Sequence, residues 1–263
     1  MIVLIKGAGD LATGVAYRLK KCGFDIVMTE IPEPTTVRRT VAFSQAVYDN
    51  NAEVEGIKAT HVSEIEEAKK IVNQGNIAVI VDEKAEIIKD FNPDVVVDAI
   101  IAKKNLGTKI NDAQIVIALG PGFTAGVDCH CVIETQRGHY LGKAIYRGSA
   151  IPNTGIPGNI GGYTKERIIR ATNDGKISPV AKIGDYVEKG DIVAYVNRTP
   201  IFAEINGIVR GILQKDVKVF KGMKSGDIDP RCEKNHCFTI SDKARSIGGG
   251  VLEAILYLKS MEK

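Results

Sequence analysis

The chain has 263 residues; 44% are hydrophobic, 25% are charged, and 35 basic against 32 acidic side chains give a net charge of +3. This composition is typical of a soluble globular protein with one large or two modest domains. The small net charge and the lack of a basic stripe with interleaved aromatic residues argue against a nucleic-acid partner. No apolar stretch is long enough to span a membrane, and an odd number of cysteines, five, favours reduced thiols in the cytoplasm.

The start of the chain carries a dinucleotide-binding pattern. A short strand of apolar residues, Ile2–Ile5, runs into the turn GAGDLA, in which Gly7, Gly9 and Ala12 hold the positions of a G-x-G-x-x-A motif. An amphipathic helix and a second strand follow, and that strand ends at Glu30. Such a unit binds a dinucleotide through the N–H groups at the helix N-terminus and an acidic residue about twenty positions later. These glycines, Ala12 and Glu30 are therefore candidate cofactor-binding residues.

Charged residues near the turn leave the identity of its ligand undecided. Asp10 follows the second glycine and would repel a pyrophosphate, unless it caps its own helix; we include it among the candidates. Glu30 would accept a ribose hydroxyl of NAD, whereas Arg38 and Arg39 would suit a 2′-phosphate or another anion. The alternative is an ordinary α/β folding unit without a working phosphate site.

Further strands alternate with helices as far as residue 128. The expected strands are Val54–His61, Ile77–Val81, Val95–Ile101 and Ile115–Leu119, and Ser63 with Glu66 predicts a capping box at the start of one helix. This alternation predicts an α/β fold, a Rossmann-like doubly wound parallel sheet over residues 1–128. Asp98, Gly120 and Gly122 fall at the carboxyl ends of the strands, where such sheets bind ligands, and join the candidate cofactor-binding residues.

The second half is richer in β structure. Residues 129–176 predict a β-rich connection with a Gly/Pro/Asn loop, either a lid or a plain connector, followed by a helix at 163–172. Residues 177–243 resemble a biotinyl/lipoyl-like barrel-sandwich module, but the hairpin tip holds Arg198 and no lysine, so a structural or docking element is expected. Residues 244–263 predict a C-terminal helix. The three glycines at 248–250 would precede it, as an anion nest or a packing contact.

The cysteines are candidates for a metal site. Cys129 and Cys131 lie on one face of an extended segment and Cys237 follows a histidine, so these thiols could converge on a soft metal. Their spacing matches no standard zinc finger, and isolated buried thiols are the alternative. No Ser–His–Asp order or paired carboxylates single out a catalytic residue, which leaves enzymatic activity open.

Three sequence blocks carry a family resemblance: KGAGDLATGVAYRLKKCGF, GPGFTAGVDCHCVIETQRGHYLGKAIYRGSAIPNTGIPG and KSGDIDPRCEKNHCFTISDKARSIGGGVLEAI. Together they resemble the YqeB-like accessory proteins of the selenium-dependent molybdenum hydroxylase system. The first block also resembles the Rossmann part of XdhC-type molybdenum-cofactor chaperones. The resemblance implies a cytoplasmic maturation factor that handles a molybdopterin-type cofactor, with selenium, for a molybdenum hydroxylase apo-enzyme. The pterin phosphate would then suit the glycine turn, and a cysteine thiol would hold selenium or molybdenum.

Two alternative functions stand beside this one. An NAD(P)-dependent oxidoreductase needs only the dinucleotide turn and a proton donor near the Gly120 loop, and it would use NAD(P) as its cofactor. A non-catalytic docking protein would bind the hydroxylase through the barrel-like module.

Overall fold

The computed structural model describes residues 1–155 and 157–261 and separates by its contacts into two units. Unit 1 is formed by Met1–Pro34, Ala42–Thr154 and Ile240–Lys263, and unit 2 by Thr35–Val41 and Gly155–Thr239. This division differs from the four predicted segments. Residues 129–154 and the C-terminal helix belong with the first sheet, while a short stretch from the N-terminal part belongs with unit 2.

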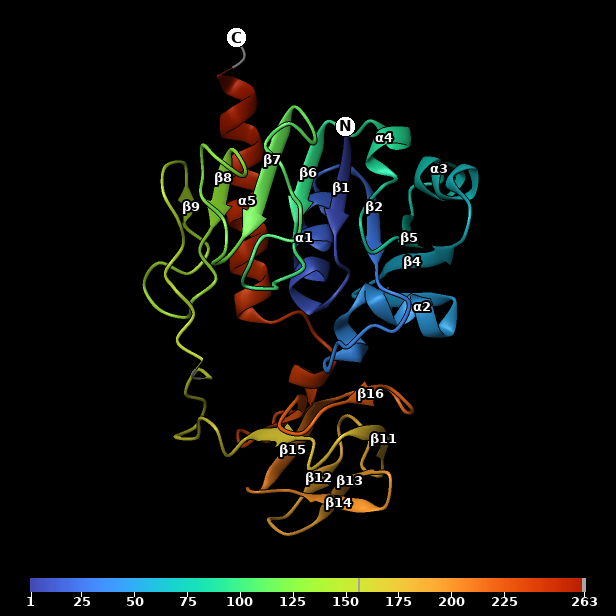
Figure 1. Cartoon of the computed structure of the whole chain (residues 1–263), viewed down its shortest axis with the longest axis vertical. Coiled ribbons are helices and arrows are strands. Elements are labelled where there is room, and N and C mark those ends of the chain that lie inside the picture. Colours follow the sequence, from blue (N-terminus) through green and yellow to red (C-terminus); the bar gives the residue numbers. More distant parts are fainter. Residues whose placement is uncertain (156, 262–263) are drawn as a thin grey trace. The chain divides into compact units, whose positions relative to one another are not determined.

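Unit 1 is built on one sheet of nine strands in the order β3-β4-β5-β2-β1-β6-β7-β8-β9 (Figure 1). The strands from β4 to β8 in this order pair in parallel, while β3 and β9 pair antiparallel at the two edges. The central strands are almost continuous runs of Val, Ile and Leu, because both of their faces are covered. The strand bounds are β1 (Ile2–Lys6), β2 (Asp25–Glu30), β3 (Asn51–Val54), β4 (Ile57–Val62), β5 (Ile77–Val81), β6 (Val95–Asp98), β7 (Ile115–Leu119), β8 (Cys131–Ile133) and β9 (Ala144–Ile145).

Two long helices pack together against this sheet. They are α1 (Asp10–Lys21) and α5 (Asp242–Ser260), and α5 also contacts β7, β8 and β9. Gly14 permits their close approach, since a Cβ there would lie 2.6 Å from the Cβ of Ala244. The short helices α3 (Ile65–Asn73) and α4 (Ile88–Phe91) share a separate core cluster with the sheet residue Leu4. The connection from β2 to β3 contains the short elements η1 (Arg39–Val41), η2 (Phe43–Gln45) and α2 (Ala46–Asp49).

The predicted Rossmann-like, doubly wound parallel sheet is corrected by this topology. The sheet is mixed, and the described connections from β6 to β7 and from β7 to β8 contain no helix. In a doubly wound fold each parallel crossover would bring its own helix. Strands β7 to β9 are covered instead by α5, which comes from the end of the chain.

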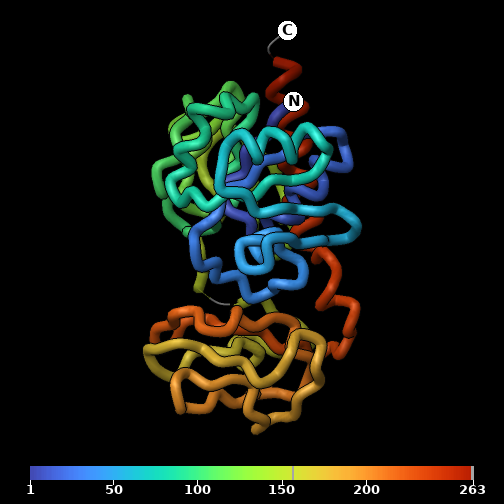
Figure 2. The backbone as a smooth tube through the Cα atoms, turned by 90° about the vertical axis from the view of Figure 1, so that its right-hand side faces the viewer, coloured from blue at the N-terminus to red at the C-terminus, as the bar shows by residue number. Residues whose placement is uncertain are grey.

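Unit 2 consists of two four-stranded sheets, ordered β10-β17-β15-β12 and β14-β13-β11-β16. Every strand pair is antiparallel, and the strands lie in stacked layers in Figure 2. Fully buried Ile177, Val193 and Ile212 belong to its core. The bounds are β10 (Ile168–Arg170), β11 (Gly175–Pro179), β12 (Tyr186–Val187), β13 (Ile192–Val196), β14 (Thr199–Phe202), β15 (Gly207–Ile212), β16 (Lys218–Val219), β17 (Lys224–Asp229) and the 3-10 turn η3 (Lys234–Cys237).

Residues 35–41, which we call the strap, complete unit 2. The guanidinium of Arg38 donates to the carbonyl oxygens of His236 at 2.9 Å and Thr239 at 3.0 Å. Close packing on β15 requires glycine at Gly211, because a Cβ there would lie 2.7 Å from the carbonyl oxygen of Val37. The strap is therefore an integral part of this β structure, although it follows β2 in sequence.

The predicted biotinyl/lipoyl-like barrel-sandwich module of residues 177–243 is corrected as well. Unit 2 begins earlier, with β10 and β11, and needs the strap, so it is not a self-contained module with those bounds. The helix predicted at 163–172 does not form. Ile168–Arg170 pairs with β17 instead, and beside that pairing Arg167 forms a buried ion pair with Asp227.

Two helix starts also differ from expectation. Helix α5 begins at Asp242 with Ser241 as its N-cap, so the three glycines at 248–250 lie inside the helix. A Cβ on Gly250 would lie 3.2 Å from Cγ2 of Ile133 in β8, which confirms the alternative of packing against the sheet, and one on Gly248 would lie 2.8 Å from the carbonyl oxygen of Gly14 in α1; the anion nest is wrong. The capping box at Ser63 is also wrong, because α3 starts after Glu64 without a side-chain cap. In the described part of the chain, no helix combines the length and apolar character that crossing a membrane requires.

Candidate functional site

The carboxyl edge of the unit 1 sheet gathers most of the predicted site residues. Gly7, Glu30, Asp98 and Gly120 follow or end β1, β2, β6 and β7, which are neighbours in the sheet. Gly7 has a left-handed φ of 88°, and a Cβ there would lie 3.2 Å from the carbonyl oxygen of Ala99. The glycine turn is therefore tight because it packs against the backbone that follows β6.

The predicted anion site at the glycine turn already faces a carboxylate of the chain. The Glu30 carboxylate accepts the N–H of Ala8 at 2.9 Å and that of Ile31 at 2.9 Å, while the N–H of Gly7 donates to the carbonyl oxygen of Thr29. Burial raises the pKa of Glu30 against the lowering effect of these two N–H groups. A phosphate placed here would meet this carboxylate and that of Asp10, so the turn fits a dinucleotide or pterin phosphate poorly. A molybdopterin-type cofactor or NAD(P) stays a prediction.

A buried polar network stands beside this turn. The ammonium group of Lys6 donates to the hydroxyl of Thr108 at 2.6 Å and lies 3.7 Å from Asp98 Oδ2. The hydroxyl of Thr108 in turn donates to Asp98 at 2.6 Å, and all three residues are nearly inaccessible to solvent. The network fixes a loop in which Ile101 has a left-handed φ of 61°, a costly conformation for a β-branched residue. Because these three side chains bond to one another, the network stabilises the structure of the loop.

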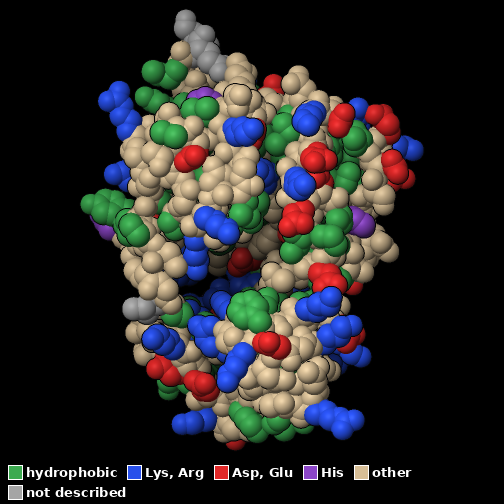
Figure 3. Space-filling model, viewed as in Figure 1, with side chains coloured by type: hydrophobic (Ala, Val, Ile, Leu, Met, Phe, Trp, Pro, Cys, Tyr) green, Lys and Arg blue, Asp and Glu red, His purple; other side chains and the backbone are tan. Residues whose placement is uncertain are grey.

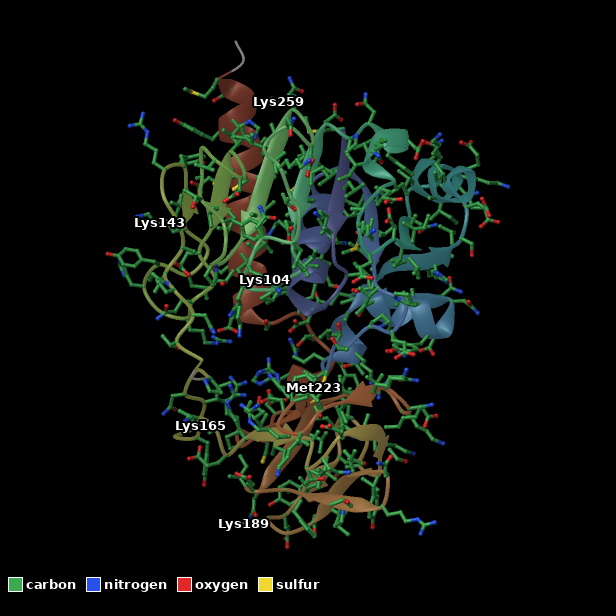
Figure 4. The ribbon with its side chains drawn as sticks, viewed as in Figure 1. Lys104, Lys143, Lys165, Lys189, Met223 and Lys259 are labelled. Atoms are coloured by element: carbon green, nitrogen blue, oxygen red, sulfur yellow. The ribbon has the colours of Figure 1, made fainter. Side chains whose placement is uncertain are left out.

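The remaining predicted residues of this edge serve packing. Ala12 is buried within α1, and a Cβ on Gly120 would lie 2.5 Å from Oγ1 of Thr135. Gly122 faces the loop after β6, because a Cβ there would lie 2.6 Å from the backbone nitrogen of Lys104, which is labelled in Figure 4. The glycines bring loops together and leave little backbone for a ligand to approach.

The cysteines of the predicted metal site belong to different units. Cys129 and Cys131 are buried in unit 1, whereas Cys237 is buried in unit 2. Burial raises the pKa of both Cys129 and Cys131 to about 12, which keeps them as thiols, whereas a metal binds thiolate. Nowhere in residues 1–155 and 157–261 do three or more His, Cys, Asp or Glu side chains form a group suited to a metal ion.

A pocket in unit 2 has a different character. Its volume is about 430 Å³, within the range of small-molecule sites. Three cations line it and no carboxylate does. The lining residues are Arg39, Thr40, Pro179, Val180, Ala181, Lys182, Ile183, Gln214 and Lys215.

Arg39 is the best-ordered cation of this pocket. Its Nε donates to the carbonyl oxygen of Ile212 at 2.8 Å, and its Nη1 donates to Oε1 of Gln214 at 2.7 Å. Lys182 and Lys215 are exposed, so their ammonium groups reach solvent. Asp185 lies outside the lining and accepts the backbone N–H of Lys182 at 2.8 Å, which orders the turn. The guanidinium is thus held in place before any ligand arrives, and the two lysines can adjust to it.

Sequence reasoning noted Arg39 but not its partners in the pocket. The lysines and Gln214 come from turns far from the strap in sequence, and no spacing links them. The only sequence signal is the pair Arg38 and Arg39 itself, two adjacent cations in a segment rich in Pro and Thr.

A second group of arginines surrounds Asp229 in the same unit. Arg231 donates to both carboxylate oxygens of Asp229 at 2.9 and 2.6 Å, and Arg210 lies 3.8 Å away. Burial acts to raise the pKa of Asp229, but the hydrogen bonds and charge of Arg231 outweigh it and lower that pKa. Burial, followed by the nearby charge of Arg38, lowers the pKa of Arg210. Unit 2 therefore concentrates cations even in its interior.

The two units carry opposite net charge. Unit 2 has 16 Lys and Arg against 10 Asp and Glu, whereas unit 1 has 19 against 22. Their net charges are therefore +6 and −3, and Figure 3 shows basic side chains over the visible face of unit 2. The total charge of the chain is small because the two units partly cancel, and unit 2 by itself is basic, which favours anionic ligands.

Comparison with known proteins gives one strong similarity. No model of a known protein family matches the sequence. The chain is 51% identical over 257 residues to a protein of Escherichia coli (strain K12) described as the uncharacterized protein YqeB. The chain is therefore similar in sequence to part of YqeB. The match covers 98% of this chain and 48% of YqeB, so the chain spans about half the length of that relative.

Similarity to solved structures is weak. A succinylglutamate desuccinylase from Silicibacter sp. TM1040 is 13% identical with a TM-score of 0.26, covering 86% of this chain and 84% of that one. The ectoine utilization protein EutE (DoeB) from Ruegeria pomeroyi is 10% identical with a TM-score of 0.26, covering 86% and 84%. An aspartoacylase family protein from Mesorhizobium loti is 12% identical with a TM-score of 0.25, covering 80% and 58%.

The predicted fold class is corrected by the sheet topology described above, and the predicted function finds no support in these comparisons. The structures matched are desuccinylase and aspartoacylase proteins, and none of them supports a Rossmann fold joined to a barrel-sandwich module. Nor do they support a maturation factor for selenium-dependent molybdenum hydroxylases, an NAD(P)-dependent oxidoreductase or a hydroxylase-docking protein. Similarities with TM-scores near 0.25 do not assign a desuccinylase activity to this chain either.

Proposed function

We propose that this chain is a binding protein for a small anionic molecule, held in the pocket of unit 2. The observation that carries the proposal is the lining of that pocket, in which Arg39, Lys182 and Lys215 supply three cations and which contains no Asp or Glu. Cations that line one pocket attract an anionic ligand. The net charge of +6 on unit 2 adds a long-range attraction for the same class of ligand.

The pocket offers an apolar surface beside its cations. Pro179, Val180 and Ile183 belong to the lining, and 56% of Val180 is exposed to solvent. An exposed valine next to a fixed guanidinium suits a ligand that has an apolar body and an acidic group. Burying the valine against that body would add to the affinity.

The experiment is isothermal titration calorimetry of the full chain with phenyl phosphate, phenyl sulfate and benzoate. We expect at least one of these anions to bind, and the variants Lys182→Gln and Lys215→Gln each to weaken binding roughly three- to fivefold, as loss of one exposed charge does. The matched control is Lys189→Gln, because Lys189 is exposed on the turn between β12 and β13 and is not part of the pocket (Figure 4). Absence of binding by all three anions at millimolar concentration, or equal weakening by the control, would overturn the proposal.

The proposal does not require the cofactors and partner expected from sequence. A molybdopterin-type cofactor, NAD(P) and a hydroxylase apo-enzyme as partner all stay predictions. The same holds for the cytoplasmic location, which was inferred from the five cysteines, all of them free thiols in the structure.

A further inference from the structure

We propose that unit 2 carries a second binding surface, a basic ribbon that binds single-stranded nucleic acid. The ribbon consists of residues 170–176 and 218–224, two segments that are distant in sequence and run antiparallel beside each other. The proposal goes beyond the small-molecule pocket, because no residue of the ribbon belongs to the lining of that pocket.

The register of the ribbon places like charges opposite each other. Arg170 is paired with Lys224 where β10 meets β17, and Lys176 is paired with Lys218 where β11 meets β16. Residues directly opposite on antiparallel strands project on the same face, and like charges at such positions are unfavourable for the pairing. A polyanion bound along the ribbon would reduce this unfavourable interaction.

Hydrogen bonds hold the two segments together between their paired ends. The N–H of Ala171 donates to the carbonyl oxygen of Met223 at 3.0 Å, and the N–H of Gly222 donates to the carbonyl oxygen of Ala171 at 2.8 Å. The N–H of Lys221 donates to the carboxylate of Asp174 at 2.7 Å. The turns are therefore ordered, and the ribbon continues from one sheet of unit 2 to the other.

The ribbon has a net charge of +4. Its two segments contain five cations, all exposed to solvent, and one carboxylate, that of Asp174. Burial raises the pKa of the Asp227 carboxyl, and the charge of Lys224 acts against that rise, so Lys224 also interacts with this buried carboxylate. The five cations are Arg170, Lys176, Lys218, Lys221 and Lys224.

An exposed aromatic ring lies among these cations. Phe220 stands between Lys218 and Lys221 in sequence, and 64% of its surface is exposed to solvent. Its carbonyl oxygen accepts the N–H of Met223 at 2.9 Å, so a tight turn holds its backbone in place. A base of a single strand can stack on such a ring while the flanking cations contact the neighbouring phosphates.

This arrangement favours a single strand over other large anions. A duplex keeps its bases stacked inside and offers none of them to Phe220. Membrane surfaces are typically met by Trp and Tyr at the interface, and the ribbon contains neither. Cations on both sides of one aromatic ring match a chain in which phosphates and bases follow one another.

Neither segment alone is a basic stripe. Residues 170–176 hold two cations and residues 218–224 hold three. The argument from sequence against a nucleic-acid partner depended on the lack of such a stripe with an aromatic residue in it. Pairing of the two segments brings their cations together around Phe220.

The test is fluorescence anisotropy of the full chain with a labelled single-stranded oligonucleotide of about 12 nucleotides, a length typical of such binding sites. We expect binding at low salt and an affinity that falls as salt rises. Lys221→Gln should weaken binding and reduce the slope of log affinity against log salt by about 0.7, the value for one phosphate of a single strand. The matched control is Lys189→Gln, because Lys189 lies at the opposite end of unit 2 from Met223 of the ribbon (Figure 4).

A second set of variants tests the aromatic ring. Phe220→Ala should weaken the oligonucleotide roughly tenfold, as loss of one stacked base does, and should leave the salt slope unchanged. Phe220→Tyr keeps a ring and should bind as the wild type does. The control is Phe202→Ala, because Phe202 is 51% exposed and lies on β14, at the opposite edge of the sheet from β16.

Several outcomes would overturn the proposal. They are absence of oligonucleotide binding at low salt, equal weakening by the control variants, equal affinity for a duplex of the same length, and binding of phosphatidylserine vesicles in place of the oligonucleotide. Lys182→Gln should change the affinity for the oligonucleotide by no more than about twofold. A loss as large as that of Lys221→Gln would place the strand in the pocket instead of on the ribbon. Calorimetry with small anions tests the pocket independently of all these results.

Discussion

Units 1 and 2 differ in how their charged side chains are arranged. In unit 1 the ion pairs Lys6–Asp98 and Arg245–Glu55 each set a cation against a carboxylate. In unit 2 the cations outnumber the acids, and three of them line an open pocket. Paired charges help to hold a fold in place, whereas cations that line a pocket attract an anionic ligand. The comparison places binding chemistry in unit 2, although the most recognisable sequence motif lies in unit 1.

The largest expected effect comes from breaking a matched pair in unit 1. Lys6→Met would leave the buried carboxylate of Asp98 without its counter-charge, and such a loss costs about 3–5 kcal/mol of unfolding free energy. Chemical denaturation measures it. Lys69→Met is the control, because the Lys69–Glu66 pair is exposed and exposed pairs contribute about 0–1 kcal/mol. Adding Asp98→Asn to Lys6→Met should recover part of the loss, and a double variant no more stable than the single one would contradict the charge argument.

Glycine substitutions in α5 give the next largest effect and test how unit 1 is packed. A Cβ on Gly250 would overlap the carbonyl oxygen of Gly142, so Gly250→Ala should cost about 1–3 kcal/mol or more. A Cβ on its neighbour Gly249 would meet no atom within 4 Å, and Gly249→Ala should stabilise the helix by about 0.5–1 kcal/mol. Thermal unfolding of the two variants measures the contrast. A similar effect of both substitutions would show that the packing of α5 does not depend on these glycines.

A smaller effect is expected at Glu55, and it depends on pH. The Glu55 carboxylate accepts hydrogen bonds from Arg245 at 2.6 and 2.8 Å and from the N–H of Ile240 at 2.8 Å. Burial acts to raise the pKa of Glu55, but these bonds and the charge of Arg245 outweigh it, and the pKa falls below its ordinary value of 4.5. A carboxyl whose pKa is lowered by folding stabilises the protein above its unfolded pKa and loses that stabilisation as the pH falls through the folded value.

Glu55→Gln should therefore lower the unfolding free energy by roughly 1–2 kcal/mol at pH 7, and the difference from wild type should shrink below about pH 4. Urea denaturation at a series of pH values measures this dependence. A difference that stays constant from pH 7 to pH 3 would show that the ionised carboxylate is not the source of the stabilisation.

The central strands of unit 1 were predictable, but the expected strand Val54–His61 is wrong, because β3 ends at Val54 and β4 begins at Ile57; the helix that covers β7 to β9 was not predictable either. Ile77–Val81 and Ile115–Leu119 are confirmed as strands, because short runs of β-branched residues are a local signal. That α5 covers β7 to β9 depends on Gly14, Gly248 and Gly250, which meet partners far away in sequence. Gly248 and Gly250, with Gly249, had suggested an anion nest, since sequence alone does not show whether a glycine faces a ligand or another backbone.

The candidate site, too, could be predicted from the sequence only in part. The glycine turn at Gly7 could be located from its motif, but the motif does not reveal that Glu30 accepts the N–H of Ala8. The pocket of unit 2 joins Arg39 of the strap to Lys182 and Lys215, which come from two separate turns. Such a site forms only through long-range folding, and no local spacing in the sequence encodes it.

The variants with the smallest expected effect on stability test the contrast between units 1 and 2 most directly. Lys182→Gln and Lys215→Gln should change the unfolding free energy by no more than about 0.5 kcal/mol, because both lysines are exposed surface residues. Phenyl phosphate well above its dissociation constant should raise the unfolding temperature of the wild type and raise it less in these variants, since a ligand stabilises only the state that binds it. Scanning fluorimetry measures both quantities. If the lysine variants lost stability as Lys6→Met does, these lysines would be part of the fold, and the distinction between charges that hold the structure and charges that bind a ligand would fail.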